Sequence, residues 1–313
     1  MKLFFVGLLL LPLFIACDQE ESGTKITGMI DNLESGMFLL GGPGGARDSI
    51  MLNEDNSFEH NFLEIEEPGN YYLLSEKDYF PMYIAPGMQL DVYFDKNNFL
   101  ESINFAGPGS DINNYKADKT RNFPRPDNDV YIKDPDAFRT WADSLLAVQQ
   151  SLLNEQFKDD VEDPFWVQEE GDLIYTWALN LTNYPSYNRY YAKVKDVELT
   201  ESFISYKDQL DINSSKYLNS TAFNNYVTSA VRVAASALKD GQEDVNRNLL
   251  NLQTATEIIT NTDVLNVYLA STVIGRMQWT DLGELQDEID FFLANCSDTT
   301  KISEFNEQYE SWK

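Results

Sequence analysis

The spacing of apolar positions along the chain changes near residue 110. From Thr24 to about Phe105, short apolar runs with alternating polar positions are separated by Gly, Pro, Asn or Asp. Such runs, with a turn signal about every ten residues, are typical of an antiparallel β-sandwich or barrel. We predict this domain at residues 24–110, with strands in the runs 24–30, 48–52, 58–65, 71–74, 80–84 and 89–94.

After Ser110 the apolar residues follow helical spacing. Asp134-Pro135 and Asp163-Pro164 each place a capping carboxylate before a proline at the first helical position. Stripes of Leu, Ile, Trp and Tyr at helical spacing then predict packed helices. Besides the helices that these two pairs start, we expect helices in the runs 223–238, 245–259, 264–277, 282–293 and 302–312.

The predicted fold is therefore an N-terminal antiparallel β-sandwich or barrel followed by an all-α helical domain. We place the helical domain at residues 134–313 and a connector at residues 111–133. The segment Arg121–Asn128 contains two prolines, which favour an extended backbone in the connector.

The first residues of the chain have the pattern of a bacterial lipoprotein signal. Lys2 precedes an apolar run from Leu3 to Ile15, which Ala16 and Cys17 follow. The run is shorter than the roughly 20 apolar residues that span a bilayer. It resembles a lipobox, in which a peptidase cuts before the cysteine and the cysteine sulfur carries lipid. An ordinary secretory signal that happens to contain Cys17 is the alternative.

We accordingly expect a signal peptide at residues 1–16, a tether at residues 17–23 and a lipid bilayer as the partner of acylated Cys17. The predicted location is the cell envelope, at the outer membrane. The acidic segment Asp18–Glu21 resembles export tags that send some lipoproteins to the cell surface. The periplasmic and the surface face both stay open.

The charge balance narrows the choice of partners. The chain has 23 Lys and Arg against 51 Asp and Glu, a formal net charge of −28. Such a chain repels phosphate backbones, so we expect no nucleic-acid partner. A solvated acidic surface is the simplest interpretation, and a bound divalent cation or a basic partner also fits. The sequence has no D-x-[DN]-x-[DN]-G calcium loop.

The small number of cysteines and histidines argues against catalysis by this chain. It has two cysteines, so a lipid on Cys17 leaves Cys296 alone, without a C-x-x-C pair. We predict that Cys296 is structural, because its acidic neighbours raise a thiol pKa. The one histidine, His60, is expected on the surface of a strand. We predict no catalytic residue, no metal site and no cofactor.

Two further motifs raise the question of a ligand. The glycine-rich stretch Gly41–Gly45 lacks the Gly-Lys-Ser/Thr of a phosphate loop, so we interpret it as a strand connection. The densest aromatic patch contains tyrosines that either pack helices together or bind a ligand by stacking. These possible binding residues are Tyr184, Tyr187, Tyr190 and Tyr191.

Several short motifs occur in a recurring order: Ile26-Thr27-Gly28, Asp48-Ser49, Asp55–Phe58, Pro68–Leu73 and, at the end, Phe305–Lys313. This order resembles the N-terminal β-domain of unknown function and the helical region of the TlpA/ResA-like thiol-disulfide interchange lipoproteins. The resemblance implies a following thioredoxin domain with a Trp-Cys-x-x-Cys active site. The present sequence ends at Lys313 without one.

Three functional hypotheses follow. The first is a lipid-anchored, non-catalytic recruiting or binding module of the thioredoxin-family lipoprotein type, with another envelope protein as a partner. The second is the N-terminal part of a thiol-disulfide oxidoreductase whose thioredoxin domain lies beyond this chain, the longer protein being a disulfide reductase. The third is a surface glycan- or nutrient-binding lipoprotein that uses the aromatic patch.

Overall fold

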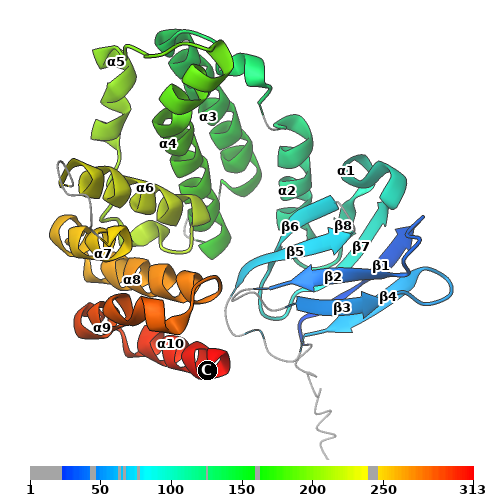
Figure 1. Cartoon of the computed structure of the whole chain (residues 1–313). Helices are drawn as coiled ribbons and strands as arrows, with labels where there is room; N and C mark the ends of the chain where they lie inside the picture. The colour runs from blue at the N-terminus through cyan, green and yellow to red at the C-terminus, as the bar shows by residue number, and fades with distance from the viewer. Residues whose placement is uncertain are drawn as a thin grey trace, which may run out of the picture. The chain divides into compact units, whose positions relative to one another are not determined.

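The computed structural model has a β-rich N-terminal part followed by helices, which confirms the predicted β plus α layout (Figure 1). It describes residues 23–42, 47–62, 65, 68–75, 78–124, 126–158, 163–238 and 246–313. The predicted signal peptide and Cys17 lie outside these residues, as does most of the Gly41–Gly45 stretch. The chain divides into two compact units, Met1–Ala117 and Asp118–Lys313, here called the β unit and the helical unit.

The β unit holds two four-stranded sheets, with strand orders β4-β1-β7-β8 and β3-β2-β5-β6. Its pairings are antiparallel except for β1 with β7, which run parallel and were not predicted. A parallel pair needs a long crossover, and here the chain between the two strands contains the whole of the other sheet together with β4. The strands are β1 Lys25–Asp31, β2 Met37–Gly41, β3 Arg47–Met51, β4 Ser57–Asn61, β5 Gly69–Ser75, β6 Asp78–Ile84, β7 Gln89–Asp95 and β8 Asn104–Ala106.

Alternation along β7 shows why these residues form a sandwich. Leu90, Val92 and Phe94 are buried, whereas the residues between them are exposed. Successive side chains of a strand point to opposite faces, so one face of β7 enters the core. Gly28 on β1 lies beside Val92, and a Cβ atom there would collide with the Val92 carbonyl oxygen. The parallel pair therefore needs glycine at this position.

A helix, α2 (Ser110–Asn122), occupies residues 111–122 of the predicted connector, so the extended backbone predicted for residues 121–128 is wrong at its first two residues. Asn113 is fully buried, accepts a hydrogen bond from the Tyr83 amide at 2.8 Å and donates one to the Tyr83 carbonyl at 2.8 Å. Asn114 makes the same pair of bonds with Phe105, at 2.9 and 2.8 Å. The two side chains thus pair with β6 and β8, the outer strands of the two sheets, as a neighbouring strand would. A short helix, α1 (Phe99–Ser102), precedes β8.

Helices α3 and α4 begin where the caps predict. The Asp134 carboxylate accepts a hydrogen bond from the Ala137 amide at 3.0 Å, and that of Asp163 from the Phe165 amide at 2.7 Å. Both prolines lie in the first helical turn. The helices are α3 Pro135–Phe157, α4 Pro164–Ala192, α5 Glu201–Ile204, α6 Thr221–Leu238, α7 Arg247–Ile258, α8 Thr262–Met277, α9 Gln286–Asn295 and α10 Thr299–Trp312. Short 3₁₀ turns are η3 Asn128–Val130, η4 Ser205–Gln209, η5 Ser215–Tyr217 and η6 Leu282–Leu285.

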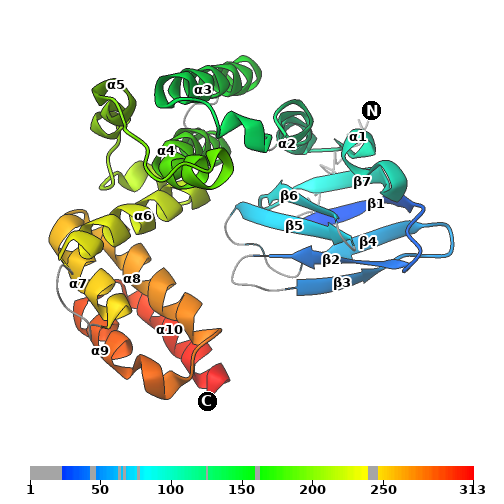
Figure 2. The same cartoon turned by 45° about the horizontal axis from the view of Figure 1, so that its top comes forward.

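Within the helical unit, α4 packs against both α3 and α6 (Figure 2). Helix α6 packs on α7, the helices α7, α8 and α9 pack on one another, and α10 packs on α8. The core of this unit is rich in aromatic residues. Phe138 of α3 stacks on Tyr184 of α4 with ring centroids 4.4 Å apart, and Phe203 packs on the same tyrosine. In the part of the chain that the structure describes, every helix is too short or too polar to cross a bilayer.

Candidate functional site

A cavity of about 510 Å³ opens in the helical unit between α3, α4 and the segment that precedes α3. Its size lies within the range of pockets that hold small organic ligands, about 300–1,000 Å³. We call it the aromatic cavity. Its lining residues are Phe123, Pro124, Pro126, Asn128, Tyr131, Ala142, Leu145, Leu146, Gln149, Thr176, Trp177, Asn180, Tyr187 and Tyr191.

Helical periodicity explains how α3 contributes to the wall. Ala142, Leu145, Leu146 and Gln149 are spaced three, four and seven residues apart, so they share one face of the helix. Ala142 is buried, whereas the other three are half-buried. The small Ala142 leaves space at the back of the cavity, and the longer side chains line its flank.

Three tyrosines form the aromatic end of the cavity. The Tyr131 ring stacks on Tyr191 with centroids 5.9 Å apart and packs against Tyr187 at 4.8 Å. The amide of buried Asn188 donates to the Tyr131 carbonyl oxygen at 2.8 Å and holds the backbone before α3. Burial, followed by the proximity of Tyr187 and Tyr191, raises the pKa of Tyr131, so its hydroxyl stays neutral at ordinary pH.

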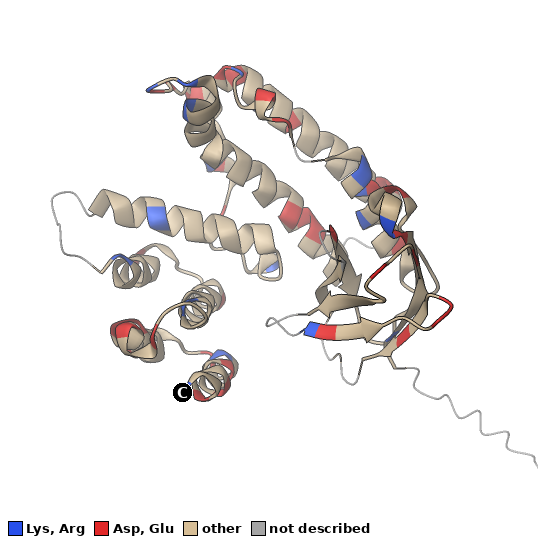
Figure 3. Ribbon diagram, turned by 45° about the vertical axis from the view of Figure 1, so that its right-hand side comes forward, with Lys and Arg blue, Asp and Glu red and all other residues tan. Residues whose placement is uncertain are grey.

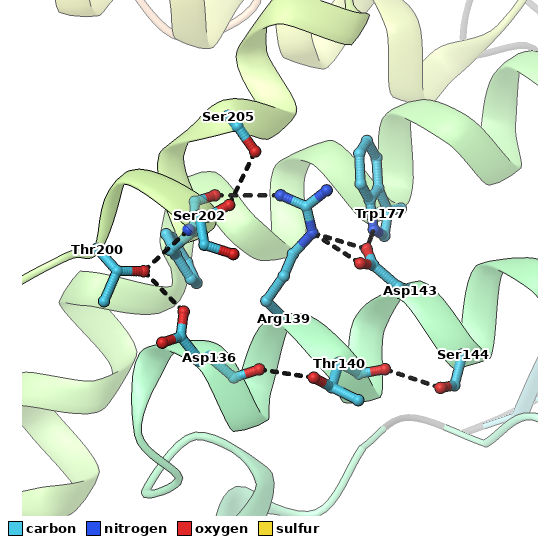
Figure 4. Close-up of polar contacts among 10 residues, drawn as sticks. Asp136, Arg139, Thr140, Asp143, Ser144, Trp177, Thr200, Ser202 and Ser205 are labelled. Carbon is cyan, nitrogen blue, oxygen red and sulfur yellow. Dashed lines mark hydrogen bonds and ion pairs between the residues drawn. The ribbon is translucent and has the colours of Figure 1, made fainter.

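A series of hydrogen bonds and ion pairs between side chains holds Trp177 of α4 in place (Figure 4). Its indole N–H donates to Asp143 Oδ1 at 2.8 Å. Arg139 Nε donates to both oxygens of Asp143, at 2.7 and 2.9 Å, and a terminal nitrogen donates to the Phe203 carbonyl at 3.1 Å. The guanidinium carbon lies 5.1 Å from the Trp177 ring centroid, a cation–π distance. The ring is therefore fixed before any ligand arrives.

The polar groups of the aromatic cavity are uncharged. Among its described lining residues there is no Asp, Glu, Lys, Arg or His. Its polar side chains are Asn128, Gln149, Thr176 and Asn180, and no described residue forms a hydrogen bond with any of the four. Three primary amides and a threonine hydroxyl near fixed aromatic rings are therefore available to a neutral, hydrogen-bonding ligand.

The four tyrosines of the predicted patch lie in three different environments. Tyr187 and Tyr191 line the cavity. Tyr184 is fully buried, and its hydroxyl donates to the Lys133 carbonyl at 2.6 Å, so it belongs to the core. Tyr190 is 75% exposed, lies outside the lining and packs edge-on against Tyr191.

The sequence prediction missed Tyr131, Trp177, Asn180 and Gln149 as lining residues. One signal for Trp177 was present, because Trp177, Tyr184 and Tyr191 are spaced seven residues apart along α4. Residues at that spacing lie on nearly the same face of a helix.

The remaining residues singled out from the sequence lie elsewhere. Cys296 is buried at the end of α9, and burial raises the pKa of its thiol, against the opposing effect of its hydrogen bond to the Asp298 backbone. His60 is on β4, half-buried, with Nε2 at 3.5 Å from an Asp48 oxygen and its ring edge-on to Phe62. Within the described ranges, no three His, Cys, Asp or Glu side chains gather as metal ligands.

No family model, curated protein or solved structure matches the chain. The resemblance to the TlpA/ResA-like lipoproteins therefore stays a prediction from the motifs.

Proposed function

We propose that this protein is a non-catalytic binding protein of the bacterial cell envelope, whose helical unit takes a neutral carbohydrate in the aromatic cavity. One observation carries the proposal. In a chain with a net charge of −28, the cavity combines fixed aromatic rings with unpaired amides, and its described lining has no charged side chain.

The chemistry of a sugar ring fits this lining. The C–H face of a pyranose is apolar and packs on Tyr or Trp rings, which supply a large contact area at low entropic cost. Its hydroxyls donate to and accept from amides such as those of Gln149 and Asn180. An acidic sugar would be repelled by the net negative charge of the chain, and the described lining has no cation to offset this repulsion. We therefore expect the aromatic cavity to prefer neutral sugars.

The envelope location rests on the N-terminal sequence. The apolar run Leu3–Ile15 followed by Cys17 supports lipid attachment at that cysteine, with the bilayer as the partner of the acyl chains. Metabolic labelling with a radioactive fatty acid should mark the wild-type protein, and Cys17→Ala should abolish both the label and the membrane fraction. Unchanged labelling of the variant would contradict this assignment.

The binding proposal is tested with a glycan array and isothermal titration on the purified protein. Tyr187→Ala removes a ring from the cavity, and the expected loss of affinity is about 10-fold, since one stacked ring contributes about 1 kcal/mol or more. Tyr190→Ala is the matched control, because Tyr190 is a neighbouring exposed tyrosine outside the lining. Equal losses from both variants, or an array without any neutral glycan bound, would refute the proposal.

A further inference from the structure

A second cavity of about 500 Å³ lies between α6 and α7 in the helical unit. Its lining is different in kind from that of the aromatic cavity, because two arginines face it from adjacent helices. We call it the arginine cavity. Its described lining residues are Arg232, Ala235, Ser236, Arg247, Asn248, Leu250 and Asn251.

Neither arginine of this cavity has a carboxylate partner among the described residues, although acidic residues outnumber basic ones 51 to 23 in the chain. Three other described arginines of the helical unit do have such partners. Arg121, Arg139 and Arg276 each lie 2.7–2.8 Å from an Asp or Glu oxygen. Arg189 also lacks a carboxylate partner among the described contacts, so what distinguishes this cavity is that two such guanidinium groups face the same space.

The two helices that form the cavity hold few acidic residues. α6 contains Arg232 and no Asp or Glu, and Figure 3 shows this helix without acidic colouring. On α7 the acidic residue is Glu257, which lies ten positions after Arg247, about 15 Å along the helix axis. The contribution of these two described helices to the field at the cavity is therefore positive. It also reaches α8, because Arg232 opposes the rise that burial causes in the pKa of Tyr268.

The start of α7 adds to this positive field. Arg247 is the first residue of the helix, where the macrodipole is positive. Asn246 caps the helix through its Oδ1 atom, which accepts from the amides of Asn248 and Leu249 at 3.1 and 3.2 Å. The side-chain amides of Asn248 and Asn251 face the cavity without a hydrogen-bond partner in the described contacts.

We infer that the arginine cavity binds a small organic molecule that carries a carboxylate or phosphate group. The planar guanidinium groups of Arg232 and Arg247 match the oxygens of such a group and form charge-assisted hydrogen bonds with it. The side-chain amides of Asn248 and Asn251 donate hydrogen bonds to further oxygens of the ligand, and Leu250 and Ala235 contact its carbon skeleton. The volume exceeds that of a bare inorganic ion and fits an organic body of several carbon atoms.

The test uses aliphatic probes that have no sugar ring, so that it is independent of the aromatic cavity. Glycerol 3-phosphate and glutarate represent the phosphate and the carboxylate, and glycerol is the neutral control. Calorimetry on the full chain should detect one or both anions, and glycerol should give no heat. Each of Arg232→Gln and Arg247→Gln should weaken anion binding by about 10-fold.

Arg189→Gln is the matched control variant. Arg189 is also exposed, and it donates to the Ser186 hydroxyl at 3.3 Å, away from this cavity. Its substitution should leave anion binding unchanged, and circular dichroism melts should show that all three variants fold. Absence of binding by both anions up to about 10 mM, or binding that survives both cavity substitutions, would overturn the inference. Binding to the Tyr187→Ala protein would be unaltered, so failure here is distinct from failure of the carbohydrate proposal.

Discussion

The two cavities of the helical unit differ in charge much more than in size. The aromatic cavity measures about 510 Å³ and has neutral amides and aromatic rings, whereas the arginine cavity measures about 500 Å³ and presents two guanidinium groups. Both described linings lack Asp and Glu in a chain that holds 51 of them. The difference teaches that overall charge is a poor guide to the ligands of this protein, since local side chains set each cavity's preference.

The largest expected effect comes from reversing the charge of the arginine cavity. In the double variant Arg232→Glu/Arg247→Glu, two carboxylates would face an anionic ligand, and affinity for glycerol 3-phosphate should fall by at least about 100-fold. Titration of a neutral glycan into the same variant should give the wild-type affinity. A loss at both cavities would mean that the two sites do not act separately.

A smaller effect is expected from removing the group that holds Trp177. Asp143→Ala leaves the indole N–H and Arg139 without their shared partner. Carbohydrate affinity should fall about 5- to 10-fold and the free energy of unfolding by about 1 kcal/mol, a modest loss because Asp143 is exposed to solvent. Ser144→Ala is the control, since that hydroxyl only donates to the Thr140 carbonyl of the same helix (Figure 4). Anion binding should not respond to either variant.

Trp177→Phe separates the ring from its hydrogen bond. The phenyl ring keeps an aromatic wall, and Asp143 keeps its two bonds from Arg139. We expect carbohydrate affinity to fall only about 2- to 4-fold, less than for Asp143→Ala. A loss equal to that of Tyr187→Ala would show that the indole contacts the ligand directly in a way that a smaller ring does not replace.

The smallest effect is expected from pH. The ionisable groups of the aromatic cavity's described lining are tyrosines, and burial raises the pKa of Tyr131 above 10. Because its neutral form persists, carbohydrate affinity should stay constant from about pH 6 to pH 9. Titrations at both pH values check this.

In the alkaline range the stability of the fold should fall as pH rises. Burial raises the pKa of Tyr184 to about 12, above the value of about 10 expected in the unfolded chain. The unfolded state therefore loses its proton first, and the stabilisation from this neutral tyrosine is present below about pH 10 and is lost as pH rises towards 12. Urea unfolding at pH 8 and pH 11 measures the difference, and equal midpoints would contradict it.

The parts of the fold that were predicted correctly depend on local chemistry. Asp134-Pro135 and Asp163-Pro164 specify their helix starts through bonds that reach only two or three residues along the chain. In contrast, α2 is polar in composition and its key contact joins Asn113 to Tyr83, 30 residues away. A pattern of apolar residues carries no information about such a bond, so the sequence predicts a connector where helix α2 lies.

The same distinction applies to the aromatic cavity. Tyr187 and Tyr191 were found because aromatic residues are dense in that part of α4. The burial of Tyr184 depends on the Lys133 carbonyl, 51 residues earlier, and α4 continues through Pro185, which ordinarily ends a helix. Tyr131 enters the lining only because the segment before α3 is tied to Asn188. These tertiary contacts lie beyond what spacing predicts.

The paired asparagines of α2 have a consequence for handling the β unit by itself. β6 and β8 are outer strands, and unpaired outer strands recruit other chains and aggregate. Asn113 and Asn114 occupy backbone groups of both at once. A fragment cut before residue 113 would leave the backbone groups of Tyr83 and Phe105 without these partners, so it should precipitate more readily than one that runs through Ala117. The solubility of the β unit thus depends in part on a helical turn that follows its last strand.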